Sequence, residues 1–210
     1  MSDYEIVNHA LGGVEVHGMT RASFILRGTL AAGAVYGMGA VGPFVSQAIA
    51  ETGGGDAAIL NFALTLEYLE ADFYTVKGKQ VGLSGQARAY ASQFGAEESE
   101  HVTALTAAIK QLGGTPVKKP TFVFPASDEM SFLALASTLE NTGVGAYNGA
   151  APSIMDKKVL VSAGSIVQIE ARHAAAIDLL IGKSPTPNQG FDRPIEKAKV
   201  LTAVKPLIKA

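Results

Sequence analysis

The chain has 210 residues, which is enough for one domain with a terminal extension. Hydrophobic residues make up 48% of it and charged residues 17%, so it is too apolar to be intrinsically disordered, and a net charge of −2 lacks the basic excess typical of nucleic-acid-binding proteins. The absence of cysteine excludes a disulfide scaffold, a cysteine-ligated zinc or iron–sulfur site and a cysteine nucleophile.

The N-terminal part contains an uncharged, Gly- and Ala-rich run at 28–50, which is long enough to span a bilayer as a helix. Arg21 and Arg27 precede this run and small residues end it, which is the order of features in a secretory signal. The stretch around the arginines also resembles a twin-arginine export signal, with Ala22 in place of the second arginine. We expect residues 1–50 to be a cleaved export signal. A retained membrane anchor and a buried packing segment are the alternatives.

Four stretches after a glycine break at 53–55 have apolar residues at helical spacing. The predicted helices cover residues 57 to about 77, about 85 to 112, 127 to about 149–151, and 153–156 to about 181. Gly78 and Gly82 are expected to end the first helix, and a break near Gly164 is left open in the fourth. No stretch shows the sustained alternation of a strand, so we predict an all-α fold.

The segments between the helices indicate the topology. The proline-rich stretch 115–125 has no helical pattern and joins the second helix to the third. We therefore predict an up-and-down four-helix bundle with one long crossover. A loop rich in Pro, Gly and Asn at 182–194 precedes a short terminal helix. The predicted parts are a leader at 1–50, the bundle at 51–182 and a C-terminal tail at 183–210.

Two copies of one short motif contain histidine. Glu98 lies three residues before His101, and Glu170 lies three residues before His173. Residues three apart on a helix share one face, so each Glu can bind the same ion as its His. The two remaining histidines, His9 and His17, lie in the leader and are expected to be solvated.

A second pattern precedes each motif by about 30 residues. Glu67 and Glu140 stand on the preceding helices, and Tyr74 and Tyr147 follow them by seven residues, which returns a helix to the same face. The chain therefore contains one pattern twice, and it places four carboxylates and two imidazoles in the bundle centre. That is the ligand set of di-iron and di-manganese carboxylate bundles. The predicted metal ligands are Glu67, Glu98, His101, Glu140, Glu170 and His173.

Other acidic residues lie close to these positions. Glu70 shares the face of Glu67, and Glu97 lies four residues before His101, but the second half has Gly143 and Ile169 instead. Glu70 and Glu97 therefore remain candidates for extra or mobile ligands, and Glu100 is expected to face solvent.

The third predicted helix contains two glycines, Gly143 and Gly145, just past Glu140. Each is unfavourable by about 1 kcal/mol relative to Ala. They would either allow close approach of a neighbouring helix or mark relaxed selection on this one.

The stretch from about 57 to 181 resembles the ferritin-like superfamily. LNFALTLEYLEADFY followed by AEESEH is most similar to bacterial ferritin-like domain proteins, often exported, that are related to desiccation-associated proteins. Rubrerythrins share the Glu-to-Tyr spacing of seven. The resemblance is less specific for activity, because storage ferritins, peroxidases, oxidases and manganese catalases share the arrangement.

Oxygen and imidazole donors suit two Fe ions, or Mn. We expect Glu98 and Glu170 to bridge the two ions, Glu67 and Glu140 to be terminal ligands, and His101 and His173 to hold one ion each. Tyr74 and Tyr147 would donate hydrogen bonds beside the site or supply electrons to it. A packed ring whose hydroxyl bonds a carboxylate is the simpler role for each tyrosine.

The favoured function is redox chemistry with O2 or H2O2, of ferroxidase or peroxidase type, in the periplasm or cell envelope. The alternative is a structural or interaction protein of the envelope whose metal site is degenerate or only stabilising. A cage-forming storage ferritin ranks lower because of the leader and the tail. Expected partners are metal ions and O2 or H2O2, without nucleic acid; membrane contact through 28–50 and homo-oligomers are both left open.

Overall fold

The computed structural model describes residues 55–209. The predicted leader at 1–50, with its uncharged run at 28–50 and with His9 and His17, lies outside the described residues. Among residues 55–209, no helix combines the length and the apolar character needed to cross a membrane.

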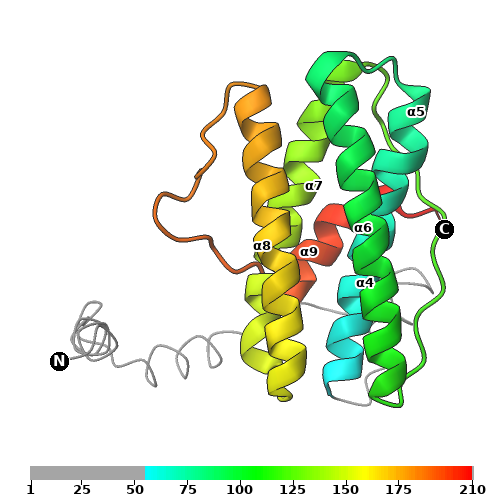
Figure 1. Cartoon of the computed structure of the whole chain (residues 1–210), viewed down its shortest axis with the longest axis vertical. Coiled ribbons are helices and arrows are strands. Elements are labelled where there is room, and N and C mark those ends of the chain that lie inside the picture. Colours follow the sequence, from blue (N-terminus) through cyan, green and yellow to red (C-terminus); the bar gives the residue numbers. More distant parts are fainter. Residues whose placement is uncertain (1–54, 210) are drawn as a thin grey trace. The chain divides into compact units, whose positions relative to one another are not determined.

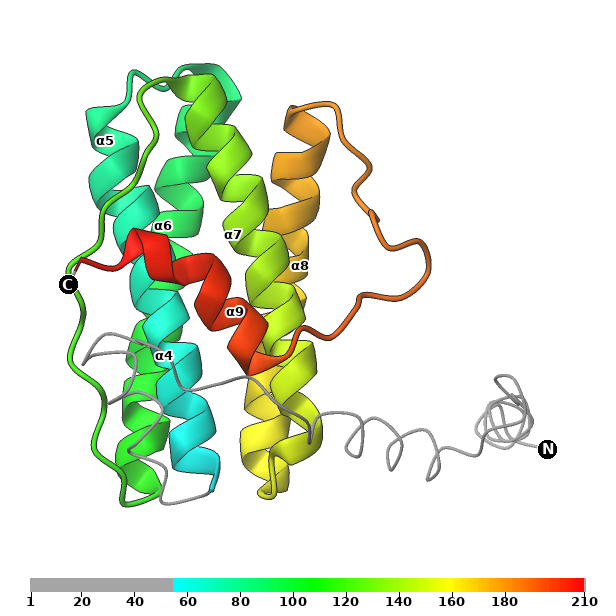
Figure 2. The ribbon, with the colours of Figure 1, turned by 180° about the vertical axis from the view of Figure 1, so that it is seen from behind.

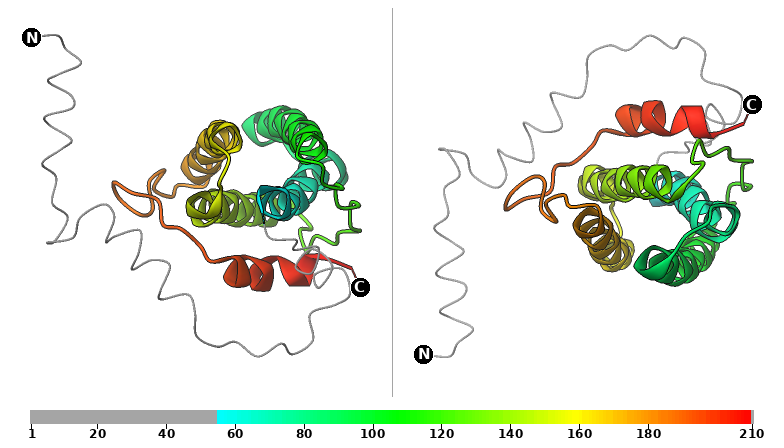
Figure 3. Two further views of the ribbon diagram at one scale, coloured as in Figure 1. Left: turned by 90° about the horizontal axis from the view of Figure 1, so that it is seen from below. Right: turned by 90° about the horizontal axis from the view of Figure 1, so that it is seen from above.

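Four long helices lie alongside one another and form a bundle (Figures 1 and 3). They are α4 (Asp56–Asp72), α6 (Gly85–Gln111), α7 (Glu129–Ala150) and α8 (Lys157–Leu180). α4 packs mainly against α6, and α7 mainly against α8, so each sequence repeat forms one helix pair. Within the described part of the chain no strand forms, and the predicted all-α bundle is confirmed.

The first predicted helix, residues 57 to about 77, is part of a longer and less regular helical segment. After α4 it continues through a π-helical turn, η1 (Phe73–Lys77), and a short helix, α5 (Gly78–Gln80), and it ends only at Val81, whose backbone is extended. Gly78 therefore does not break the helix. It lies where the path packs closely, since a Cβ there would be 3.5 Å from Ala91 and from Phe132. α8 runs through Gly164 without a break.

The link between α6 and α7 runs the length of the bundle, so these two helices point in the same direction (Figure 1). Asn61 on α4 holds the start of this crossover: its Nδ2 donates to the Thr115 carbonyl at 3.0 Å, and its Oδ1 accepts from the Val117 amide at 2.8 Å. Both polar groups of a buried side chain are thereby satisfied, which is the usual condition for burying them. The predicted long crossover is confirmed.

The C-terminal tail crosses the outside of the bundle. Its helix α9 (Lys197–Val204) and the turn η3 (Lys205–Leu207) lie over α4 and α7, as Figure 2 shows. A Cβ at Gly145 or Gly149 of α7 would collide with Ile195, whose amide donates to the Gly145 carbonyl at 2.8 Å. Gly145 thus admits a close neighbour, as expected, but this neighbour is the segment before α9 instead of a packed helix.

Two apolar clusters fill the interior of the bundle. One contains Phe73 and Phe132, whose rings stack at 4.3 Å, and it includes Tyr74. The other surrounds Leu64 and includes Tyr147. Each of the two tyrosines singled out by the sequence therefore belongs to a different cluster, and its ring is fixed by packing.

Candidate metal centre

The six predicted ligands converge in the interior of the bundle, and all four helices contribute. α4 carries Glu67, α7 carries Glu140, and α6 and α8 each carry one Glu and one His. The four carboxylates are completely buried, and His173 and His101 are 2% and 9% exposed. Carboxylates in an apolar interior are costly unless they are paired or bound to a cation.

The cluster divides into two quartets. Glu67, Glu98, His101 and Glu170 form one, and Glu98, Glu140, Glu170 and His173 form the other. Within each quartet one donor atom of every residue lies within 4.8 Å of the others. Glu98 and Glu170 belong to both quartets, which is the position expected of two bridging carboxylates.

The donor atoms crowd together without satisfying one another. Nδ1 of His101 lies 3.1 Å from oxygens of Glu67, Glu98 and Glu170, yet one ring nitrogen carries at most one proton. Nδ1 of His173 lies 2.8 Å from Oε1 of Glu98 without hydrogen-bond alignment. Five buried atoms of the cluster make no hydrogen bond, a rare state for buried polar atoms. They are Oε1 of Glu98, Oε2 of Glu140, both carboxylate oxygens of Glu170 and Nδ1 of His173.

This geometry fits a pair of cations. Buried oxygens and an imidazole nitrogen that lack hydrogen bonds and lie within 4.8 Å of further donor atoms are what a metal ion would bind, and a nitrogen-and-oxygen donor set suits Fe(II) or Mn(II). Two divalent ions would also balance the charge of four carboxylates.

The two tyrosines bond across the bundle. The Tyr74 hydroxyl donates to Oε1 of Glu140 at 2.5 Å, and the Tyr147 hydroxyl donates to Oε1 of Glu67. Each tyrosine thus bonds a carboxylate of the other helix pair that belongs to one quartet alone, and Oε2 of that carboxylate faces a histidine of the quartet. Burial, followed by the adjacent carboxylate, raises the pKa of both phenols well above the ordinary value, so both remain protonated donors.

Gly143 makes room for two carboxylates. A Cβ at this position would lie 3.1 Å from Oε1 of Glu70 and 3.1 Å from Oε2 of Glu170. Gly143 is also the residue that corresponds to Glu70 in the second half of the repeat. The glycine that is unfavourable in a helix therefore leaves space for carboxylates of the neighbouring helices α4 and α8. Glu70 is 3% exposed and lies outside both quartets, so an extra-ligand role for it stays a prediction.

Glu97 occupies the outer side of His173 and lies outside both quartets. Its Oε2 lies 2.6 Å from Nε2 of His173, whereas Nδ1 of that ring faces the cluster. In this geometry Glu97 contacts the His173 ring from the side away from the cluster, and its carboxylate is not grouped with the other four. Phe94 stacks on the same ring at 3.9 Å, and Glu100 is exposed, as expected.

Burial opposes ionisation of most of these carboxyls. It raises the pKa of Glu67 to about 8, against a hydrogen bond to His101 that lowers it. Burial also raises the pKa of Glu70, Glu140 and Glu170, and repulsion from neighbouring carboxylates adds to it.

For the two imidazoles and for Glu98, which belongs to both quartets, neighbouring charges outweigh burial and favour the ionised form. Burial disfavours the Glu98 carboxylate, but the neighbouring imidazoles of His101 and His173 outweigh burial and lower its pKa to about 2. Burial alone would lower the pKa of both rings; the carboxylates outweigh it and raise the pKa of His101 to about 12 and of His173 to about 11. The metal-free cluster therefore holds extra protons, and metal binding would release them.

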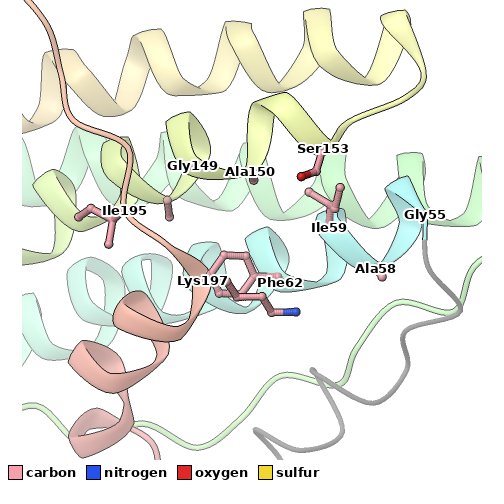
Figure 4. A pocket seen from close by; sticks show the side chains of 10 residues that line it. Gly55, Ala58, Ile59, Phe62, Gly149, Ala150, Ser153, Ile195 and Lys197 are labelled. Carbon is pink, nitrogen blue, oxygen red and sulfur yellow. The ribbon is translucent and has the colours of Figure 1, made fainter. Parts of the chain in front are cut away.

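Sequence reasoning missed a cavity on the outside of the bundle. It has a volume of about 260 Å³ and lies between α4, α7 and the segment before α9 (Figure 4). Phe62, Gly149 and Ile195 form its walls, and Nζ of Lys197 lies 5.2 Å above the Phe62 ring. None of the predicted ligands lines it. The sequence contains no local signal for this cavity, because its walls come from three separate segments.

A four-helix bundle whose interior holds two carboxylate–imidazole quartets defines a ferritin-like fold with a buried Glu and His cluster that could hold metal. The model of the ferritin-like domain family matches residues 55–183, and the chain belongs to this family. The predicted resemblance to the ferritin-like superfamily is confirmed, whereas the export signal lies outside the described residues.

Two solved structures share the fold. A conserved hypothetical protein from Mycobacterium tuberculosis matches with a TM-score of 0.56 and 17% identity, over 60% of this chain and 90% of its own. A structure of ferritin-like, diiron-carboxylate proteins from Bacillus anthracis str. Ames matches with a TM-score of 0.53 and 23% identity, over 68% of this chain and 100% of its own. At these identities the likeness shows the fold alone. No curated protein matches the chain.

Proposed function

We propose that the protein binds two iron or manganese ions in the bundle centre and oxidises Fe(II) with O2 or H2O2. One observation carries the proposal: two buried quartets share Glu98 and Glu170, and five of their buried donor atoms lack hydrogen bonds. When bound, two Fe(II) ions supply two electrons, enough to reduce H2O2 to water or O2 to H2O2. Ferroxidase and peroxidase activities both fit this chemistry.

The side chains of the chain would divide the work as their positions suggest. Glu98 and Glu170 would each contact both ions, because they alone belong to both quartets. Glu67 and Glu140 would each bind one ion through Oε2, while the tyrosine bonded to Oε1 keeps the carboxylate from turning. The buried surroundings exclude bulk water, which strengthens these interactions.

We further propose that the protein works in the periplasm or cell envelope. The order of arginines, uncharged run and small residues before position 51 supports this location. Intact mass of the protein purified from its native host tests it, because cleavage near residue 50 removes the run and retention keeps it.

Anaerobic loading tests the metal chemistry. Protein freed of metal is titrated with Fe(II), and O2 or H2O2 is then added. We expect about two Fe(II) per chain, followed by a ferric absorbance that develops on oxidation. The double variant Glu98→Gln/Glu170→Gln should lose both, whereas Glu100→Gln, an exposed residue on α6, should behave like the parent. Bound iron that gives no absorbance change would contradict the oxidase activity, and absence of bound metal would favour the structural role.

A further inference from the structure

The two histidines of the centre are held differently, although they come from the same repeated motif. His173 has a carboxylate near each nitrogen: Nδ1 lies 2.8 Å from Oε1 of Glu98 in the quartet, and Nε2 lies 2.6 Å from Oε2 of Glu97. Its ring also stacks on Phe94, with 3.9 Å between centroids and 22° between planes. Within residues 55–209, the polar contacts of His101 all involve Nδ1. Only one imidazole is therefore fixed from both sides.

This difference is visible in the sequence repeat. Glu97 is the residue before Glu98 on α6, and the corresponding residue before Glu170 on α8 is Ile169. An isoleucine side chain has no hydrogen-bond acceptor. The repeat thus supplies a carboxylate beside one histidine and an alkyl group at the matching position, so the inequality does not depend on one side-chain conformation.

A carboxylate behind a metal-binding imidazole has a known physical effect. By accepting the Nε2–H proton, Glu97 selects the tautomer of His173 whose Nδ1 lone pair faces the quartet, and its charge makes that lone pair a stronger donor. Gln93 holds Glu97 in turn, since its Nε2 donates to Oε1 of Glu97 at 3.1 Å. His101 has no such partner among the described residues.

The two histidines also differ in solvent exposure, and His173 is again the more enclosed of the two. The side chain of His101 is 11% exposed, that of His173 is 2% exposed, and the four carboxylates are completely buried. An ion held by the His101 quartet would therefore have a ligand that reaches solvent, whereas the ligands of the His173 quartet are all shielded from it.

We propose that Glu97 is a positioning residue for His173, and that the two metal positions differ: the His173 quartet retains its ion, whereas the His101 quartet exchanges its ion with solvent. The proposal rests on the metal centre described under the proposed function. It adds that one ion is a fixed part of the protein and that the other position is the entry point for Fe(II).

Titration of the metal-free full-length protein with Co(II) tests this without any turnover. We expect two resolved binding steps, followed by the visible absorption of Co(II) and by calorimetry. Glu97→Ala should weaken the tighter step by about 10–100-fold and leave the weaker step unchanged. Glu97→Gln keeps an acceptor but loses the charge, so it should weaken the same step less. Glu100→Gln, on the exposed side of α6, is the matched control.

Two further measurements assign the steps. His101→Ala should abolish the weaker Co(II) binding step and leave the tighter one. Adding Glu97→Ala to this variant should still weaken the remaining step. Nitrogen NMR of the Zn(II)-bound protein should show His173 as the Nε2–H tautomer. Equal weakening of both steps by Glu97→Ala, no weakening of either, or loss of the tighter step in His101→Ala would overturn the inference while two bound ions still support the proposed function. A parent protein that binds no Co(II) would instead refute the metal centre itself.

Discussion

The hydroxyl of Tyr74 donates a hydrogen bond to Oε1 of Glu140 at 2.5 Å, although 66 positions separate the two residues in the chain. Tyr147 makes the reciprocal bond to Glu67. The two helix pairs are therefore joined at the centre by a pair of crossed hydrogen bonds, each from a protonated phenol to a buried carboxyl. These bonds leave only Oε2 of Glu140 and of Glu67 to face the quartets.

Loss of one phenol hydroxyl is expected to weaken both the fold and the centre. Tyr74→Phe leaves Oε1 of Glu140 buried without its donor, which should lower the free energy of unfolding by about 1–3 kcal/mol. The freed carboxylate can turn, so metal affinity should also fall. Urea unfolding and Co(II) titration measure the two effects. Tyr90→Phe makes the same chemical change on α6, where no hydrogen bond to the hydroxyl is found among the described residues, and should change neither. Equal effects of the two variants would contradict this role of Tyr74.

Much of the centre could be predicted from the sequence because it depends on spacing within single helices. The Glu-x-x-His motif and the Glu-to-Tyr interval each report one helix face, and the repeat selects the six residues common to both halves. What spacing cannot report is which helix faces which. The sequence therefore did not reveal that Tyr74 meets Glu140 instead of a residue of its own pair, nor that Glu97 on α6 meets His173 on α8.

The glycines of α7 show a second limit on what the sequence alone can predict. A sequence reports that Gly143 and Gly145 lack a side chain, but the reason for each lies in a distant segment. Gly143 leaves space for the carboxylates of Glu70 and Glu170, and Gly145 leaves space for Ile195. The π-helical turn at Phe73–Lys77 also left no signal, because its residues suit an ordinary helix as well.

A methyl group at Gly143 should disturb the centre without disturbing the helix. Gly143→Ala gains about 1 kcal/mol of helix propensity, but its Cβ would lie 3.1 Å from oxygens of the buried Glu70 and Glu170, so both carboxylates would have to shift. We expect a smaller rise in melting temperature on metal addition than in the parent protein. Gly164→Ala on α8 is the control, because a Cβ there meets nothing within 4 Å. It should stabilise the protein by about 1 kcal/mol with unchanged metal binding. If both glycine variants bind metal like the parent, Gly143 does not serve the centre.

Shared and terminal carboxylates should differ in how many ions they affect. Glu98 belongs to both quartets and Glu140 to one, so Glu98→Gln should weaken both Co(II) binding steps and Glu140→Gln only one. Each loss should exceed the roughly 10–100-fold expected for an outer hydrogen-bond partner, since a ligand atom itself changes. Metal content after gel filtration and calorimetric titration measure this. A single lost step in both variants would mean that Glu98 does not bridge.

The metal-free protein should become less stable as the pH rises from about 4.5 to 8. In this window the unfolded carboxyls lose their protons near the ordinary pKa of 4.5, whereas burial keeps Glu67 protonated up to its raised pKa of about 8. The folded state then binds more protons, and its stability falls with increasing pH. The histidines act in the same direction above pH 6.5, because their pKa is raised in the folded state, whereas the lowered pKa of Glu98 acts only below 4.5.

Bound metal should oppose this loss of stability with rising pH, because the metal ions replace the extra protons of the cluster. We expect the rise in melting temperature on adding Mn(II) or Co(II) to grow between pH 5 and pH 8. The variant Glu67→Gln removes one titrating group, so its metal-free melting temperature should fall less steeply over this range than that of the parent. Glu100→Gln, which removes an exposed carboxylate from α6, should keep the parent slope. A metal-free melting temperature that rises toward pH 8, or a Glu67→Gln slope equal to the parent's, would show that the buried carboxyls do not hold these protons.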